Sequence, residues 1–350
     1  MPERPAFTAG GVDVLVPCYN YGTFLEACVN SVLQGTVRPV RILIADDCST
    51  DQTPQIASAL AARHPNVFYL RHARNIGHIA TYNDGIQWAT SAYFVLLSAD
   101  DLVAPGAIER AADFLDTHPD VGLVYGRTHT FFGEAPARAC AIEAFETAVV
   151  DGADFIRSVF ADSHNPIASP ASVMVRTALQ QDIGGYRPEL PHAGDLEMYL
   201  RFAARAAIGF LDIEQGLYRR HASNMSHGFQ DLRDYAQRLA AFEAIGLNDR
   251  ARLPDHATLL QRVRRTMALE LVWAASGAFE QGAQGGASGI DEQLAFAATL
   301  DPSIRRARCW HSLRVKRMLG RVWARRAVSL LSRVHQSVIA QAGKKVLVRE

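Results

Sequence analysis

The first hundred residues alternate between short apolar runs and segments whose apolar positions recur every three or four residues. The runs predict buried strands over 12–16, 40–45, 67–70 and 93–97. The segments between them predict helices over 23–33, 53–64 and 79–89, the second with Thr53 as its N-cap and Pro54 as its first residue. This alternation predicts an α/β fold, a Rossmann-like, mostly parallel central sheet flanked by helices, whose ligand crevice lies at the carboxyl ends of the strands.

The pattern changes after residue 228. Apolar residues fall at helical spacing among many charges over 231–278, and a Gly-rich stretch at 281–289 reads as a loop. We therefore expect a domain over 1–228, with a first half over about 1–103 and a second half over about 104–228. A C-terminal helical appendage with a basic tail is expected over 229–350.

Charge is distributed unevenly along the 350 residues. The chain has 36 basic and 36 acidic residues, but 13 of the basic ones and a single acid lie in 303–350. Because the basic and acidic charges cancel over the whole chain, the net charge argues against nucleic acid as a partner. The tail also has few aromatic side chains on which bases could stack, which argues against single-stranded nucleic acid. The sequence thus predicts an acidic body with a basic tail.

The tail carries an apolar stripe among its arginines. An amphipathic basic helix can lie on an anionic bilayer, which predicts peripheral membrane contact at the inner face of the membrane. Alternatively the stripe packs on the acidic body, or an apolar face of the appendage forms a homodimer interface. The stripe consists of Val315, Leu319, Val322, Leu330, Val334 and Val338.

Cysteine usage and the N-terminus indicate the compartment. The five cysteines are widely spaced and form no C-x-x-C pair, which fits a reducing cytosol. The first ten residues have charge and two prolines where a signal peptide has an apolar run, and no run of eighteen apolar residues follows. A cytoplasmic protein is expected.

Polar clusters follow each of the four predicted strands, and two of them contain acidic pairs. The clusters are 17–20, 46–51, 71–77 and 98–101, which bring Asp46-Asp47 and Asp100-Asp101 to the same edge of the sheet. Each pair alone could be a solvated turn. Two such pairs repel each other unless hydrogen-bond donors or a hard cation such as Mg²⁺ or Mn²⁺ compensate them, and such an ion usually completes its shell with phosphate oxygens. These loops therefore predict a nucleoside diphosphate ligand.

Four motifs in this order resemble those of family-2 glycosyltransferases with the GT-A fold. They are Val14-Leu15-Val16-Pro17-Cys18-Tyr19-Asn20, Asp46-Asp47-Cys48-Ser49-Thr50-Asp51-Gln52-Thr53, Arg74-Asn75-Ile76-Gly77 and Leu97-Ser98-Ala99-Asp100-Asp101. The resemblance covers about 12–226, roughly two thirds of the chain.

The resemblance assigns donor-binding roles to these loops. It implies that Tyr19 packs on the base of a nucleotide-diphosphate sugar, that Asp46 or Asp47 hydrogen-bonds this base, and that Asp100 and Asp101 serve the ribose and a Mn²⁺ or Mg²⁺ ion. The family's fullest motif has an aspartate where Ser98 stands, so which of the two aspartates is the direct metal ligand stays open. Pro17, Asn20, Asn75 and Ser98 complete the implied donor site.

A second motif, Gly184 to Arg201, points to catalysis. Gly184-Gly185 is expected to form a turn that approaches a ligand closely, and a helix begins at about Asp195. On one interpretation Asp195 is an N-cap and Glu197 with Arg201 forms an exposed i,i+4 pair. On the other, which the resemblance favours, Asp195 is the general base of an inverting transfer. Family members often have Glu-Asp here, whereas this chain has Gly194-Asp195.

The segment 217–226 resembles the end of the family's catalytic domain. The resemblance makes His221 a candidate metal or diphosphate ligand, although a lone histidine is more often structural. Arg220, with Arg219 beside it, could pair with phosphate oxygens. The stretch 164–170 is expected near the acceptor side.

Together these features predict an inverting, metal-dependent glycosyltransferase. It would move a sugar from a nucleotide-diphosphate sugar to a hydroxyl of a glycan or lipid-linked glycan, in the synthesis of a surface polysaccharide or another glycan. Two alternatives are a non-catalytic sugar-binding module and a sugar nucleotidyltransferase. The latter would need a Gly-rich loop with arginine after the first strand, and Pro17-Cys18-Tyr19-Asn20 is no such loop.

Overall fold

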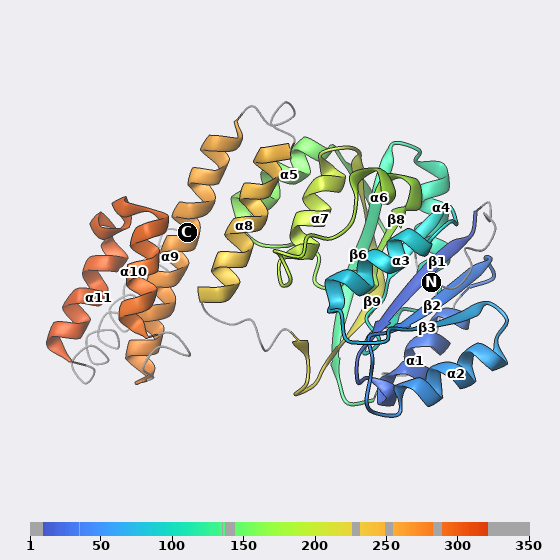
Figure 1. Ribbon diagram of the computed structural model, residues 1–350. Helices are drawn as coiled ribbons and strands as arrows, with labels where there is room; N and C mark the ends of the chain where they lie inside the picture. The colour runs from blue at the N-terminus through green and yellow to red at the C-terminus, as the bar shows by residue number, and fades with distance from the viewer. Residues whose placement is uncertain are drawn as a thin grey trace, which may run out of the picture. The chain divides into compact units, whose positions relative to one another are not determined.

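The computed structural model describes residues 10–34, 36–134, 136, 144–225, 232–248, 255–282 and 289–320 (Figure 1). The chain divides into two compact units. The first comprises residues 1–229 and 237–259, and the second comprises 230–236 and 260–350.

The first four strands form the parallel half of the sheet. They are β1 (Val12–Cys18), β2 (Val40–Asp46), β3 (Val67–Arg71) and β4 (Tyr93–Leu96), and they pair in the order β3-β2-β1-β4. Each predicted strand is present, so the expected α/β architecture with a Rossmann-like first half is confirmed. Because these strands run in parallel, the loops that follow β1, β2 and β3 emerge at one edge.

Helices cover both faces of this half (Figure 1). The helices α1 (Gly22–Leu33) and α2 (Thr53–Arg63) pack on the face to which Val14 and Val16 contribute. On the opposite face α3 (His78–Trp88) brings Gly85 so close to β1 that an added Cβ would lie 2.2 Å from Leu15 Cδ2. Alternate β1 residues thus serve the two faces, as expected for a strand buried on both sides.

The start of α2 differs from the expectation by one residue. Gln52 is the N-cap and Thr53 is the first helical residue, so Thr53 is not the cap. The carboxylate of Asp51 takes the capping role instead, because its Oδ1 accepts from the Thr53 N–H at 2.9 Å and its Oδ2 from the Gly22 N–H at 3.0 Å. One side chain thereby fixes the starts of both α1 and α2.

The second half of the sheet is mixed. The strand β8 (Val173–Arg176) pairs antiparallel with β4 and with β6 (Val121–Phe132), and β6 is parallel to β9 (Ala207–Arg220). The remaining elements of this half are β5 (Leu102–Val103), α4 (Ala107–Thr117), β7 (Thr147–Val150), α5 (Gly152–Asp162), a 3-10 turn (Pro170–Ser172), α6 (Thr177–Ile183) and α7 (Gly194–Ala203). Since β9 ends at Arg220, it returns the chain to the edge where the polar loops lie.

The C-terminal third is helical, as expected. From residue 237 onward α8 (Leu232–Asn248) belongs to the first unit, where Phe242 contacts Phe160 with ring centroids 4.7 Å apart. The second unit contains most of α9 (His256–Gln281) together with α10 (Ile290–Leu300), a 3-10 helix (Pro302–Arg306) and α11 (Arg308–Leu319). Its core includes Met267, Leu271, Ile304 and Leu313.

Only part of the predicted tail stripe can be described. Val315 and Leu319, on α11, are 53% and 54% exposed. Val322, Leu330, Val334 and Val338 lie outside the described residues.

Candidate active site

The loops after β1 and β2 are tied together by Asn20. Its backbone has a positive φ of 59°, its N–H donates to Ser49 Oγ at 2.9 Å, and its Oδ1 accepts from the Thr50 N–H at 2.8 Å. Beside it Tyr19 is 47% exposed and Pro17 is partly buried. The loop is therefore held by polar contacts while one aromatic ring is left open at the surface.

The two carboxylates of the first acidic pair differ in their partners. Asp46 is fully buried, and its oxygens accept from the Ser49 N–H at 2.7 Å and the Tyr69 hydroxyl at 2.9 Å. Asp47 accepts from the N–H groups of Ile76 and Gly77, each at 2.8 Å. Asp46 thus shapes its own loop, whereas Asp47 fixes the loop after β3.

The loop after β3 is held on a second side by a histidine. His72 Nδ1 lies 3.0 Å from Asp47 Oδ1, and its Nε2 lies 3.1 Å from Asp84 Oδ2. Asn75 stays exposed, with its Oδ1 accepting from the Gly77 N–H at 3.1 Å. Sequence reasoning missed His72, because nothing in its local pattern shows that it lies between two carboxylates.

Asp101, in the second acidic pair, is turned into the protein. Its Oδ1 accepts from the Arg219 N–H and its Oδ2 from the Ser169 hydroxyl, both at 2.9 Å. Burial, and then the charge of Asp100, raise the pKa of Asp101 well above its ordinary value. The stretch expected near the acceptor side therefore supports this pair through Ser169.

Asp100 faces the end of β9. Its Oδ2 lies 3.1 Å from His221 Nε2 and 3.2 Å from Asn224 Nδ2. His221 stacks on Phe24 with ring centroids 4.8 Å apart, and the edge of Tyr21 adds a 5.6 Å contact. Burial raises the pKa of Asp100, and the hydrogen bond from His221 opposes that rise. The histidine is thus locked in front of one carboxylate.

Asp100 and His221 have donor atoms of the kind found in a Mn²⁺ or Mg²⁺ site that uses few protein ligands. Asp100 Oδ2 and His221 Nε2 lie 3.1 Å apart, so one oxygen donor and one nitrogen donor are adjacent. Within the part of the chain that the structure describes, no group of three or more His, Cys, Asp or Glu side chains could hold a metal ion. These two side chains therefore fit a Mn²⁺ or Mg²⁺ ion only as part of its shell.

The two arginines at the end of β9 have different environments. Arg219 is buried between Phe24 and Phe131, 4.9 and 4.6 Å from their ring centroids, and its Nε donates to the Asp100 carbonyl at 2.9 Å. Arg220 is exposed, and Ser98 is partly buried. Of the two arginines, only Arg220 is therefore open to a phosphate.

Asp195 lies in the first turn of α7, whose N-cap is Ala193. The interpretation of Asp195 as the N-cap is therefore wrong. Its carboxylate is partly buried, and burial raises its pKa to about 6, against the opposing effects of a hydrogen bond from Tyr186 and the charge of His192. Such a pKa suits a group that takes up a proton near neutral pH.

Asp195 and the second acidic pair face a common side chain. Burial, then the charge of Asp195, then that of Asp100 raise the pKa of the Tyr82 hydroxyl. Because the charges of both carboxylates act on one hydroxyl of α3, the candidate base and the candidate metal ligand lie within electrostatic range of the same side chain.

Glu197 and Arg201 form a buried pair, contrary to the expectation of an exposed one. Glu197 is 0% and Arg201 7% exposed, and Arg201 Nε donates to Glu197 Oε2 at 2.9 Å. The helix α7 is buried on nearly all sides, so an i,i+4 spacing in its sequence does not indicate a solvent-facing position.

The turn at Gly184-Gly185 approaches a protein side chain rather than open space. A Cβ at Gly185 would lie 2.4 Å from Asn83 Oδ1, and Gly184 has a φ of +87°. The expectation that this turn lets the backbone approach a ligand is not met at Gly185, where the close neighbour is Asn83.

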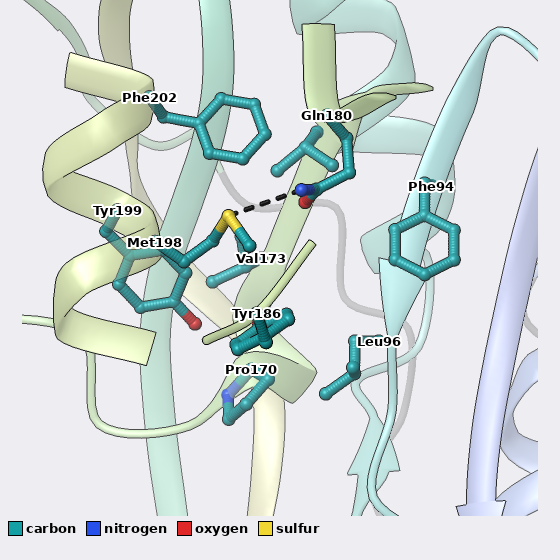
Figure 2. Close-up of a pocket in the computed structure, with 10 residues that line it drawn as sticks. Phe94, Leu96, Pro170, Val173, Gln180, Tyr186, Met198, Tyr199 and Phe202 are labelled. Carbon is teal, nitrogen blue, oxygen red and sulfur yellow. Dashed lines mark hydrogen bonds between the residues drawn. The ribbon is translucent and has the colours of Figure 1, made fainter. Parts of the chain in front are cut away.

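A pocket beside α7 is small. Phe94, Leu96, Tyr186, Met198 and Tyr199 are among its lining side chains, and Figure 2 shows the Gln180 amide reaching the Met198 sulfur. Its volume of about 20 Å³ has room for a water molecule but not for a sugar ring. This pocket is therefore too small to hold a sugar.

The strand order, the mixed second half and the carboxylates at the sheet edge define a GT-A fold. Residues 13–178 match the family model for glycosyl transferase family 2. S. aureus TarS 1-349, solved with UDP-GlcNAc, superposes with a TM-score of 0.58 over 88% of this chain and 91% of its own, at 20% identity. A mannosyltransferase of Pyrobaculum calidifontis, solved with GDP-Man and Mn²⁺, gives a TM-score of 0.55 at 17% identity over 93% and 86%.

Curated relatives are more similar in sequence, over part of each chain. An uncharacterized Mycobacterium tuberculosis protein is 27% identical over 61% of this chain and 67% of its own, and two further mycobacterial alignments cover 58% of the relative. An uncharacterized glycosyltransferase of Rickettsia conorii is 27% identical over 68% of this chain and 37% of its own length. For several relatives the chain thus spans less than two thirds of their length.

Proposed function

We propose that this chain is an inverting, metal-dependent glycosyltransferase that moves a sugar from a nucleotide-diphosphate sugar to a hydroxyl of a glycan or lipid-linked glycan. The observation that carries the proposal is that Asp100 lies 3.1 Å from His221 at the sheet edge while the charges of Asp100 and Asp195 both act on the Tyr82 hydroxyl. We assign one carboxylate to the incoming hydroxyl and the other to the leaving group. The match to the family model and the structural neighbours, which were solved with UDP-GlcNAc or GDP-Man, support this assignment.

In the proposed reaction Asp195 takes the proton of the acceptor hydroxyl as its oxygen bonds to the anomeric carbon. The bond between that carbon and the diphosphate breaks, and the diphosphate leaves with the bonding electrons. Asp100 and His221 would hold Mn²⁺ or Mg²⁺, which neutralises charge on the departing diphosphate when bound. Asp101 keeps Asp100 in place, because its own oxygens are engaged by Ser169 and Arg219.

The donor would lie along the loops at the edge of the sheet. Tyr19 offers an exposed ring for the base, with Asp46, Asp47 and Asn20 shaping the loops beside it. Pro17, Asn75 and Ser98 complete this wall, and Arg220 is open to a phosphate oxygen.

A binding screen combined with two variants tests this proposal. We expect UDP, GDP or dTDP to raise the melting temperature only with Mn²⁺ or Mg²⁺ and not with EDTA. Asp195→Asn should keep that shift but lose release of the nucleoside diphosphate from UDP-GlcNAc or GDP-mannose, by 10²-fold or more, on the order of the loss of a general base. Asp100→Asn should lose the metal-dependent shift itself.

Asp120→Asn is the matched control, because Asp120 is exposed just before β6. It should change neither readout. Unaltered turnover in Asp195→Asn would contradict the assignment of the base, and nucleotide binding that ignores metal would contradict metal dependence.

We also propose that the second unit brings the enzyme to an anionic membrane surface, in the cytoplasm. Within the described residues, no helix has the length and apolarity required to cross a bilayer. The segment 305–317 has six basic residues and no acid, and Val315, Met318 and Leu319 are exposed beside them. Exposed cations next to exposed apolar side chains are the features of a peripheral membrane contact.

A further inference from the structure

The buried side chain of Asn224 joins the two segments that carry Asp100 and His221. Asn224 is 6% exposed and lies just after the end of β9. Its Nδ2 donates to Asp100 Oδ2 at 3.2 Å and to the Arg219 carbonyl at 3.0 Å, and its Oδ1 accepts from the His221 N–H at 2.6 Å. One buried amide therefore bonds to a carboxylate and to the backbone of the segment that faces it.

These contacts connect parts of the chain that are distant in sequence. Asp100 follows β4, and 124 positions separate it from Asn224. Arg219 is a second link between the same segments, because its Nε donates to the Asp100 carbonyl and its N–H to Asp101 Oδ1, each at 2.9 Å. Arg219 thus fixes the backbone at Asp100, whereas Asn224 binds the Asp100 carboxylate.

Asn224 and His221 approach the same oxygen of Asp100. Asn224 Nδ2 lies 3.2 Å and His221 Nε2 lies 3.1 Å from Asp100 Oδ2. Because both bonds go to one oxygen, they limit rotation of the carboxylate and so fix the direction of the other oxygen. The same amide holds the His221 backbone, so one side chain sets both members of the pair.

The ring of His221 is held by aromatic residues. Phe24 stacks on it with ring centroids 4.8 Å apart, and the edge of Tyr21 contacts it at 5.6 Å. The Tyr21 hydroxyl also donates to the Ser223 carbonyl at 3.0 Å. Aromatic contacts therefore fix the plane of the ring, and the Asn224 amide fixes the backbone that carries it.

Closing the turn after β9 does not require the bond to Asp100. The Asn224 N–H donates to the His221 carbonyl at 3.2 Å, and Oδ1 accepts from the His221 N–H, so the turn is closed by local bonds. The bond from Nδ2 to the distant carboxylate comes in addition to these. The side chain of Asn224 thus has a contact that the local fold leaves unexplained.

We infer that Asn224 is a positioning residue of the candidate metal site, holding the Asp100 carboxylate and the His221 backbone so that both side chains can bind one Mn²⁺ or Mg²⁺ ion. This inference rests on the proposed function. Residues that orient the ligands of a metal ion typically contribute about 10- to 100-fold to its affinity. Asn224 acts through Asp100 and His221, because its Nδ2 is a donor and its Oδ1 is bonded to a backbone N–H.

Asn224→Ala removes the amide and tests the inference. Electron paramagnetic resonance with Mn²⁺ alone should show binding at least about 10-fold weaker than in the wild type. The Mn²⁺ concentration at the midpoint of the thermal shift with UDP or GDP should rise by the same factor, and saturating Mn²⁺ should restore the full shift. A purely structural role would lower the melting temperature at every Mn²⁺ concentration and leave that midpoint unmoved.

Asn66→Ala is the matched control. Asn66 is partly buried just before β3, and its Nδ2 donates to the Val40 carbonyl at 2.9 Å. Its loss should lower stability without changing the affinity for Mn²⁺. If Asn224→Ala does not fold, Asn224→Thr keeps the test, because a single hydroxyl cannot replace the two polar atoms of the amide and should also weaken Mn²⁺ binding.

The combined results separate this inference from the proposed function. If Asn224→Ala weakens Mn²⁺ binding while Asp195→Asn keeps its turnover, Asn224 positions the metal site and the proposed base is wrong. If Asp195→Asn is inactive but Asn224→Ala binds Mn²⁺ as tightly as the wild type, the inference fails and the proposed base stands. Equal weakening by Asn66→Ala also overturns the inference. A wild type that binds Mn²⁺ neither alone nor with UDP or GDP overturns both.

Discussion

Individual carboxylates at the sheet edge have roles that their sequence positions do not distinguish. Both carboxylate oxygens of Asp46, Asp47 and Asp101 accept hydrogen bonds from groups of the protein, whereas Asp100 faces His221. These partners determine which carboxylate is left for a ligand. Both members of the first pair are therefore engaged within the protein, whereas the second pair combines the engaged Asp101 with Asp100, which faces His221.

The raised pKa of Asp195 predicts a dependence of stability on pH. Its folded pKa of about 6 lies above the ordinary 3.8, so the folded state holds a proton that the unfolded state has lost. The stabilisation of the folded state by this bound proton is complete below pH 4 and is lost as the pH rises through 6. Asp195→Asn cannot ionise, so it should be more stable than the wild type at pH 8 by about 1–2 kcal/mol.

Urea unfolding at pH 4 and pH 8 measures this difference. The stability of Asp195→Asn relative to the wild type should rise between the two pH values. A constant difference would show that the carboxylate is not destabilised by burial. The expected variant is thus inactive but more stable, the usual result of removing a strained functional charge.

At the residue scale the sequence predicted which residues gather but not how they are used. Asp100, His221 and Asp195 were proposed as site residues from their motifs. The contact of Asn224 with Asp100 was not predicted, because the two residues lie 124 positions apart and no local pattern indicates it. The burial of Glu197 and Arg201 was missed for the same reason.

At the scale of elements, α7 is tied to the turn before it by the buried pair of Glu197 and Arg201. Arg187 adds a third charge, since its Nε donates to Glu197 Oε1 at 2.7 Å. A carboxylate with no exposed surface is thus compensated by two guanidinium groups, one buried and one partly exposed. Such an arrangement fixes geometry more than it adds stability, because desolvation offsets much of the attraction.

Removing one partner of the Glu197–Arg201 pair should therefore lower the free energy of unfolding. Arg201→Ala leaves Glu197 buried with less compensation and removes the donors to the carbonyls of Ile183 and Gly185, so we expect a loss of about 3–5 kcal/mol in urea unfolding. Arg63→Ala, which breaks the exposed pair with Glu26, should cost less than about 1 kcal/mol.

If Arg201→Ala does not fold, the double variant Glu197→Leu/Arg201→Met keeps the prediction testable. It replaces the charges by side chains of similar size and should recover part of the lost stability. Equal destabilisation by the single and the double variant would show that the charge itself is not what makes the single variant unstable.

The elements themselves were largely predictable. The first four strands and three helices agree with the sequence to within one or two residues, because apolar periodicity fixes them and each lies between turn residues. The mixed half was less accessible: β8 is four residues long and pairs between β4 and β6, and β9 reaches fourteen residues only through its partners. Pairing between distant segments is not encoded in local patterns.

At the scale of the whole molecule, charge is separated along the chain. The first 302 residues hold 23 basic and 35 acidic residues, whereas 303–350 hold 13 basic residues and one acid. Part of this basic charge lies on the described surface of the second unit, where Arg305, Arg306 and Arg314 are exposed. A chain with zero formal net charge can therefore be attracted to an anionic surface at one end only.

This separation predicts binding to anionic vesicles that depends on the second unit. Vesicles that contain phosphatidylglycerol should sediment the wild type at low salt and release it as ionic strength rises, whereas phosphatidylcholine vesicles should not bind it. Replacing Arg305, Arg306 and Arg314 by Gln removes about 1 kcal/mol of membrane-binding free energy per residue, so the affinity for the vesicles should fall about 100-fold.

The matched control replaces three exposed arginines of the first unit by Gln and should bind like the wild type. These are Arg63, Arg157 and Arg205. Equal binding by all three proteins would place the membrane contact elsewhere, and sedimentation without lipid would instead identify self-association through the exposed Val315, Met318 and Leu319.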